Sequence, residues 1–264
     1  MRIGACTVTF RQNTPARWIA LAKEAGLDGL EWGGDFHVPP LDLENAAAVR
    51  EMTVAAGLKV LSYGSYYRPL AEDIQARLPT PSYGFADVLD TARTLGAATI
   101  RLWAGNRSPD TYLQSERKRL AEHYREAADL AAQQGITLAF EYHRGTLTET
   151  AESTLAWLEE VGAPNAKTYW QPNPEISHAA RLKELELLTG YIANMHVFCW
   201  VRNAQNDRDE RLPLSAGVSQ WGEYIAAARA GGADPDLLLE FVRGDFEKQF
   251  YEDAVVLRTL AGRL

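Results

Sequence analysis

Short apolar runs of β type alternate along this chain with longer segments in which apolar residues recur at three- and four-residue spacing. The segment from Pro15 to Ala25 is one example of the second kind, and this spacing is typical of amphipathic helices. Glycines such as Gly96 and Gly162 end helical segments just before the next apolar run. The eight predicted strands are Ile3–Val8, Asp28–Trp32, Leu58–Gly64, Thr99–Trp103, Ile136–Tyr142, Ala166–Gln171, Ile192–Phe198 and Asp236–Phe241.

This eightfold alternation predicts an α/β fold, a single (β/α)8 barrel of parallel strands. The 264 residues suit one such barrel, and no linker or low-complexity tract divides them, so we predict one domain over residues 1–264. The long connections follow strands, where a barrel places its active site. They are Gly33–Pro40, Ser65–Ser82, Ala104–Ser115 and Cys199–Val218.

Four apolar runs in the second half of the chain end in a residue that can bind a metal ion. These residues are Glu141, Gln171, His196 and Glu240, separated by 30, 25 and 44 positions, about one strand–helix unit or slightly more. In a parallel barrel all four would meet at the carboxyl-end mouth. Two carboxylates, an imidazole and an amide suit one divalent cation, for which we favour Mn²⁺, with Mg²⁺, Co²⁺ or Zn²⁺ as alternatives. Without a metal, the glutamates would instead pair with a barrel cation such as Arg101.

Other polar residues near strand ends are candidates for substrate binding. His143 would point the same way as Glu141, and Glu31, His37 and Arg243 closely follow or end strands. For each of these four, a structural role in a loop or cap is the alternative. Four tryptophans at strand ends would suit the C–H faces of a sugar, or would simply cap the core. They are Trp32, Trp103, Trp170 and Trp200.

Composition narrows the classes of partner. The formal charge of −8, without a Lys/Arg cluster, argues against nucleic acid. No apolar stretch reaches the ~18 residues needed to span a membrane, and the first residues resemble a strand rather than a signal peptide. Two distant cysteines, Cys6 and Cys199, are typical of reduced thiols. We therefore predict a cytoplasmic protein with a small-molecule substrate, and the sequence is compatible with a homo-oligomer.

The chain resembles the sugar phosphate isomerase/epimerase superfamily, whose members are xylose-isomerase-like barrels. The resemblance covers essentially the whole chain and rests on the segment from Gly26 to Trp32 and on Glu141, His196 and Glu240. It implies a substrate-contacting role for Arg202, six residues after His196. The family's usual aspartate at the end of the sixth strand is Gln171 here, which bears on metal affinity and identity.

The resemblance implies a divalent-metal-dependent epimerase or isomerase that acts on a ketose or keto-sugar through an enediolate. Glu141 and Glu240 would exchange protons with the substrate as acid and base. One alternative is a lyase, in which the enolate loses a β-hydroxyl, as in the inosose dehydratases of this group. A second alternative is a non-catalytic sugar-binding barrel with a decayed metal site, which Gln171 would explain. The sequence leaves the sugar and its phosphorylation open.

Overall fold

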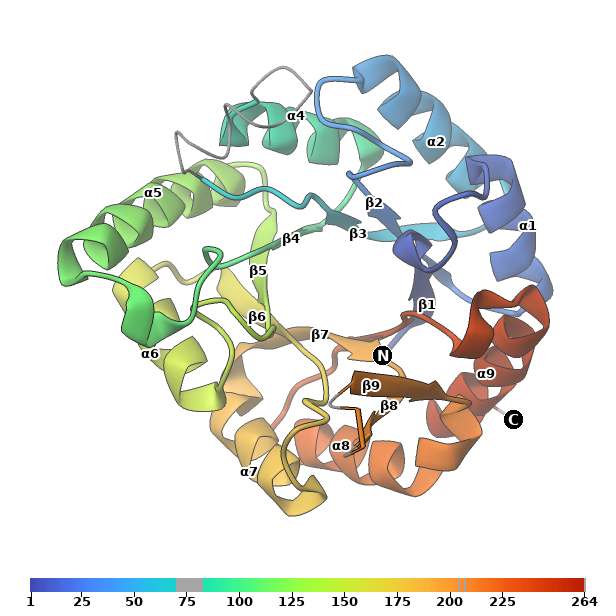
Figure 1. The fold of residues 1–264 in the computed structure, drawn as a ribbon. Helices are drawn as coiled ribbons and strands as arrows, with labels where there is room; N and C mark the ends of the chain where they lie inside the picture. The colour runs from blue at the N-terminus through green and yellow to red at the C-terminus, as the bar shows by residue number, and fades with distance from the viewer. Residues whose placement is uncertain (70–82, 204, 207, 264) are drawn as a thin grey trace.

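The computed structural model describes residues 1–69, 83–203, 205–206 and 208–263, and it contains a closed barrel of parallel strands (Figure 1). Each barrel strand pairs with the next along the chain, and the last pairs with the first through Leu237 opposite Ile3. The predicted barrel is therefore confirmed. Its strands are β1 Ile3–Cys6, β2 Gly29–Gly33, β3 Lys59–Gly64, β4 Thr99–Leu102, β5 Thr137–Glu141, β6 Ala166–Trp170, β7 Ile192–Val197 and β10 Asp236–Leu239.

A ring of helices surrounds the barrel (Figure 1). Local signals fix several of their ends: the Thr14 side chain accepts a hydrogen bond from the Arg17 amide at the start of α1, with Pro15 as the first helical residue. Gly96 and Gly162 end α4 and α6 in the left-handed region, at φ 81° and 65°. The described helices are α1 Pro15–Glu24, α2 Leu43–Ala55, α4 Phe85–Leu95, α5 Gln114–Ala132, α6 Ala151–Val161, α7 His178–Leu188, α8 Val218–Ala230 and α9 Glu247–Leu260.

Strand alternation divides the buried residues into two clusters. A small cluster that includes Cys6, Tyr169 and Leu238 lies inside the barrel. A much larger cluster, with Trp18 and Trp157 among its bulkiest members, packs the outer faces of the strands against the helices. Because successive strand residues face opposite sides, a shift of one position decides whether a side chain lies in the barrel interior or under the helices.

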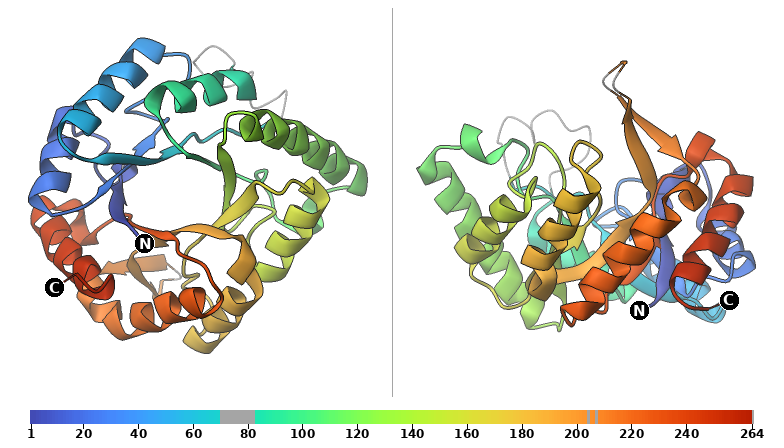
Figure 2. Two further views of the ribbon diagram at one scale, coloured as in Figure 1. Left: turned by 180° about the vertical axis from the view of Figure 1, so that it is seen from behind. Right: turned by 90° about the horizontal axis from the view of Figure 1, so that it is seen from below.

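The connection Cys199–Val218 differs from the long loop that the sequence predicts. It contains an antiparallel hairpin of β8 (Cys199–Asn203) and β9 (Arg208–Leu212), which projects from one end of the barrel, opposite the end where the amino terminus lies (Figure 2). Several residues of these strands are charged and partly exposed, so the sequence lacks the apolar alternation that marks a strand.

The amino-terminal strand is shorter than the sequence predicts. The first strand ends at Cys6 because a short 3₁₀ helix, η1, occupies Thr7–Phe10. The predicted connection Ser65–Ser82 lies mostly outside the described residues. Among the described helices, none is long and apolar enough to cross a membrane.

Candidate active site

Four polar side chains meet inside the carboxyl end of the barrel. Glu141 ends β5 and His196 lies near the end of β7, while Gln171 and Glu240 directly follow β6 and β10. The Nδ1 atom of His196 lies 3.1 Å from Gln171 Oε1, 3.4 Å from Glu240 Oε2 and 3.7 Å from Glu141 Oε1. The structure thus brings together the four residues that the sequence marks as candidate ligands.

The electrostatics of this cluster follow from its burial. His196 is fully buried, and Glu141 and Glu240 are 4% and 7% exposed. Burial raises the pKa of Glu240 to about 7, with Glu141 adding to the effect and His196 opposing it. Burial would lower the pKa of His196, yet the carboxylates of Glu240, Glu31 and Glu141 raise it to about 9. The carboxylates therefore create a strongly negative potential around the imidazole.

The donor set fits a divalent cation. Ligand atoms of Glu141, His196 and Glu240 lie within 4.8 Å of one another, and the Gln171 amide oxygen faces the same imidazole nitrogen. Carboxylate and amide oxygens suit hard cations, and one imidazole nitrogen is compatible with Mn²⁺ and similar borderline ions. A cation would compete with the proton on His196, because only a neutral imidazole nitrogen ligates a metal.

An arginine lies beside this cluster, where it pairs with a candidate ligand. Arg101 of β4 is 2% exposed; its Nε donates to Glu31 Oε1 over 2.9 Å and its Nη1 donates to Glu141. Ser62 of β3 donates to the other Glu31 oxygen over 2.8 Å. Burial would raise the pKa of Glu31, but Arg101 and His196 hold it well below its ordinary value. Glu31 is therefore a permanent carboxylate that positions Arg101.

Two of the four candidate tryptophans lie away from the mouth. Trp32 and Trp170 are fully buried in the cluster between barrel and helices, and Trp170 packs against Trp221 and Tyr224 of α8. The predicted aromatic wall therefore does not include them. The reason is alternation: Trp32 follows the inward Glu31, so its own side chain points outward.

The other two candidate tryptophans are partly exposed. Trp103 lies 4.4 Å from His143 between ring centroids, and the Arg68 guanidinium covers Trp103 at 4.0 Å. Trp200, at the base of the hairpin, packs on Phe198 at 4.5 Å. A small pocket of about 40 Å³ is lined by residues that include His143, Gln171 and Trp200. These side chains are thus placed near the metal-ligand candidates.

The remaining candidates divide between loop structure and the hairpin. His37 is buried, and its Nε2 lies 3.0 Å from the Asn13 carbonyl oxygen. Its ring packs edge-on against Trp32. These contacts are typical of a residue that orders its loop. Arg243 is exposed in η5 (Arg243–Asp245). Arg202 of β8 pairs with Asp209 over 3.1 Å and with Glu175 over 3.3 Å.

Two residues that sequence reasoning missed have unusual backbone conformations beside the site. Tyr66 and Phe241 adopt positive φ angles of 54° and 52°, which are uncommon for residues with large side chains. The Tyr66 ring covers the Arg101 guanidinium at 4.6 Å, and the Phe241 amide donates to Thr9 Oγ1 over 3.0 Å. These contacts fix the turn directly after Glu240 and one wall of the Arg101 site. The sequence carries no glycine there that would have signalled such turns.

Comparison with known proteins supports the same architecture. The model of a family described as xylose isomerase-like TIM barrel matches residues 19–260. A 3-dehydroshikimate dehydratase of Bacillus anthracis is 26% identical over 251 residues, covering 87% of each chain.

Two solved structures extend this comparison. The structure of a probable 3-dehydroshikimate dehydratase from the same organism superposes with a TM-score of 0.79 at 22% identity, over 97% of this chain and 98% of that one. A D-allulose 3-epimerase from Methylomonas sp., solved in complex with D-allulose, gives a TM-score of 0.74 at 17% identity, over 100% and 97%. Relatives named as enzymes therefore share the fold with this chain.

Proposed function

Because the chain belongs to the xylose isomerase-like TIM barrel family, we propose that it is a divalent-metal-dependent enzyme that removes the proton next to the carbonyl of a polyhydroxylated keto compound. The observation that supports this most directly is the convergence of Gln171, Glu240 and Glu141 oxygens on one nitrogen of His196. A carbonyl compound with adjacent hydroxyls is the substrate class that such a site suits.

Glu141, Gln171, His196 and Glu240 would hold the cation, with Mn²⁺ favoured by the mixture of oxygen donors and one nitrogen. When bound, the cation supplies Lewis-acid stabilisation of the negative charge that develops on the carbonyl oxygen. Trp103 and His143 at the rim would contact the sugar-like part of the substrate, and Arg101 orients Glu141.

The first candidate function is epimerisation or isomerisation of a ketose or keto-sugar. Glu240 takes the proton alpha to the carbonyl, and Glu141 returns a proton from the other direction, since the two residues stand on β10 and β5. Return to the opposite face of the same carbon inverts its configuration. Return to the neighbouring carbon interconverts aldose and ketose. The D-allulose 3-epimerase of the same fold supports this substrate class.

The second candidate function is dehydration of a cyclic keto acid. Two observations favour it: the 26% identical relative is named a 3-dehydroshikimate dehydratase, and the two glutamates have different surroundings. Both glutamates lie near His196 Nδ1, but Glu141 is also bound by Arg101. A reversible epimerase needs two carboxylates that exchange roles, but elimination needs only one residue that takes the proton and gives it to the departing hydroxyl. The inequality of the pair therefore favours the lyase.

One experiment in D₂O separates these outcomes. The Mn²⁺-loaded protein is incubated with D-allulose, D-fructose and 3-dehydroshikimate, and proton NMR follows deuterium incorporation while ultraviolet absorbance follows formation of an aromatic acid. Exchange with inversion supports the epimerase, and loss of water without exchange into recovered substrate supports the dehydratase. Binding of a sugar with no exchange in any substrate, or no bound metal in the purified protein, would overturn the proposal and favour the non-catalytic barrel.

A further inference from the structure

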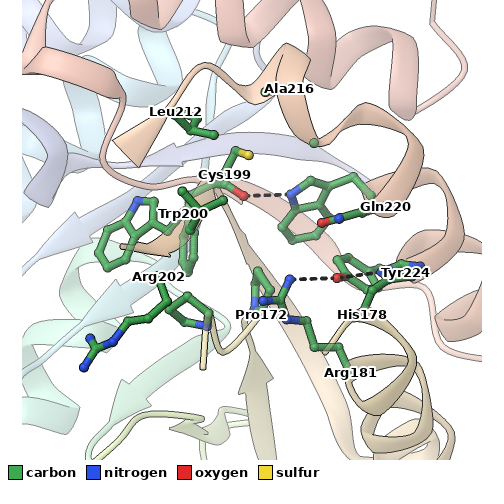
Figure 3. Close-up of a pocket in the computed structure, with 15 residues that line it drawn as sticks. Pro172, His178, Arg181, Cys199, Trp200, Arg202, Leu212, Ala216, Gln220 and Tyr224 are labelled. Carbon is green, nitrogen blue, oxygen red and sulfur yellow. Dashed lines mark hydrogen bonds between the residues drawn. The ribbon is translucent and has the colours of Figure 1, made fainter. Parts of the chain in front are cut away.

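A second pocket lies beside the site, between α7, α8 and the base of the β8–β9 hairpin (Figure 3). Its volume is about 260 Å³, below the ~300–1,000 Å³ typical of sites for drug-sized ligands, so its occupant would be small. Aromatic residues Phe198, Trp200, Trp221 and Tyr224 form much of its lining. Trp221 is held in place by a hydrogen bond of 2.8 Å from its Nε1 to the Phe198 carbonyl oxygen.

The charge of this pocket is positive and unevenly balanced. Among the described residues that line it, none is an aspartate or glutamate. The described contacts of the Arg181 guanidinium are with neutral oxygens: Nε donates to the Asn173 carbonyl over 2.8 Å and Nη1 to the Tyr224 hydroxyl over 3.2 Å. By contrast, His178 is paired with Glu223 over 2.9 Å, and Arg202 is paired with Asp209 and Glu175. Among the described residues, Arg181 is therefore the lining arginine that makes no direct ion pair with a carboxylate, and Glu184 on the same helix interacts with its charge only from a greater distance.

We propose that this pocket binds a small planar carboxylate, an aromatic acid whose ring packs on the Trp200 and Trp221 side and whose carboxylate pairs with Arg181. A guanidinium is the side chain best matched to a carboxylate, and flat aromatic walls favour a flat apolar body over a flexible one. The proposal does not rest on the proposed reaction, because neither Arg181 nor Trp221 belongs to the metal-ligand cluster.

A ligand in this pocket would affect the candidate active site, because the two share part of one wall. Pro172, Phe198 and Trp200 line both this pocket and the small pocket that includes Gln171. Pro172 follows Gln171 directly in the chain. A ligand that orders this shared wall would change substrate binding at the mouth without occupying it, so its effect on the apparent KM should level off as the pocket fills, unlike direct competition.

Cys199 supplies a direct readout. Cys199 is partly exposed and lines the pocket, whereas Cys6 is fully buried in the barrel. Saturating benzoate should slow maleimide labelling of Cys199 by about tenfold or more, because the bound ring would limit access to the pocket. Benzamide, the neutral isostere, should protect only at concentrations about tenfold higher. Cys199→Ser should abolish labelling, which identifies the reacting thiol.

Variants locate the bound acid. Arg181→Gln should raise the benzoate concentration that protects Cys199 by about tenfold or more. Arg181→Lys should retain part of the protection. Lys183→Gln removes a charge from the exposed surface of α7 and is the matched control, so it should leave protection unchanged. His196→Ala should leave protection intact. The proposal would be overturned if benzamide or inorganic phosphate protected Cys199 as well as benzoate does, or if benzoate gave no protection at all. It would also be overturned if Arg181→Gln left protection unchanged or if His196→Ala abolished it.

Discussion

Arg101 and Glu141 form an ion pair in the interior of the barrel mouth, where both side chains are almost completely buried. Glu141 is at the same time within 3.7 Å of His196 Nδ1, so one of its oxygens faces Arg101 and the other faces the candidate metal cluster. Arg101 also binds Glu31, which lies 70 positions earlier in the chain. A single guanidinium therefore sets the orientation of the carboxylate on which the proposed chemistry depends.

Arg101→Met should destabilise the protein, because it leaves the buried carboxylates of Glu31 and Glu141 without their common partner. Breaking a buried ion pair costs about 3–5 kcal/mol, which lowers the melting temperature of a protein of this size by roughly 10 °C. Thermal unfolding followed by circular dichroism measures the change. Arg93→Met is the control: Arg93 forms an exposed pair with Asp90, and its loss should cost about 1 kcal/mol or less. Equal melting temperatures for the two variants would contradict the role given to Arg101.

Glu240→Gln should keep the fold and lose turnover, because an amide cannot accept the substrate proton although it fills the same space. The expected loss in kcat is roughly 10²–10⁴-fold, towards the upper end since Glu240 has no substitute for its role. Steady-state kinetics with whichever substrate exchanges or dehydrates would measure it. Glu141→Gln should match this loss in an epimerase but fall short of it in a dehydratase that uses one base. Near-normal turnover of Glu240→Gln would refute proton transfer by this residue.

His196→Ala should lose bound metal before it loses the fold. The strand β7 remains anchored by Met195 and Val197, which are fully buried in the cluster under the helices. We expect a lower metal-to-protein ratio by elemental analysis with little change in far-ultraviolet circular dichroism. Wild-type metal content in this variant would mean that the metal site is elsewhere.

The sequence predicts the barrel and the convergence of Glu141 and His196 because both depend on local signals: an apolar run, and a polar residue where the run ends. It does not predict the Arg101–Glu31 pair, since nothing local links residues on different strands. It also assigns Trp170 to the mouth although alternation, with Tyr169 inside the barrel, turns Trp170 outward. The position of a strand end can therefore be predicted from the sequence, but predicting which way each side chain points also requires the register of the strand.

His37 gives a test that separates loop structure from substrate contact. Burial lowers the pKa of His37 below its ordinary value of 6.5, so the unfolded chain binds a proton more readily than the folded protein does. This residue's contribution to stability is therefore present above about pH 6.5 and decreases as the pH falls below it. His37→Gln, which keeps a donor for the Asn13 carbonyl and has no titration, should show a smaller fall in melting temperature between pH 7.5 and pH 5.5.

The same variant should leave kcat/KM close to the wild-type value at pH 7.5 if His37 only orders its loop. A large loss of kcat/KM at unchanged melting temperature would instead assign His37 to substrate binding. An unchanged pH dependence of melting would show that His37 does not titrate on unfolding as its burial implies.

Gln171 makes the most specific prediction about the metal. A divalent cation held by Glu141, Glu240 and a neutral His196 carries no net formal charge, and Gln171 adds none. Gln171→Asp adds one negative charge within reach of His196 Nδ1, where the amide oxygen now lies at 3.1 Å. It should bind Mn²⁺ more tightly in calorimetry or chelator competition. It should also slow the chemical step, because a site with more negative charge stabilises the developing oxyanion less well.

Gln171→Asn, a neutral but shorter side chain, is the matched control for geometry. Unchanged Mn²⁺ affinity in the aspartate variant would show that residue 171 does not contact the metal, leaving Glu141, His196 and Glu240 as its protein ligands.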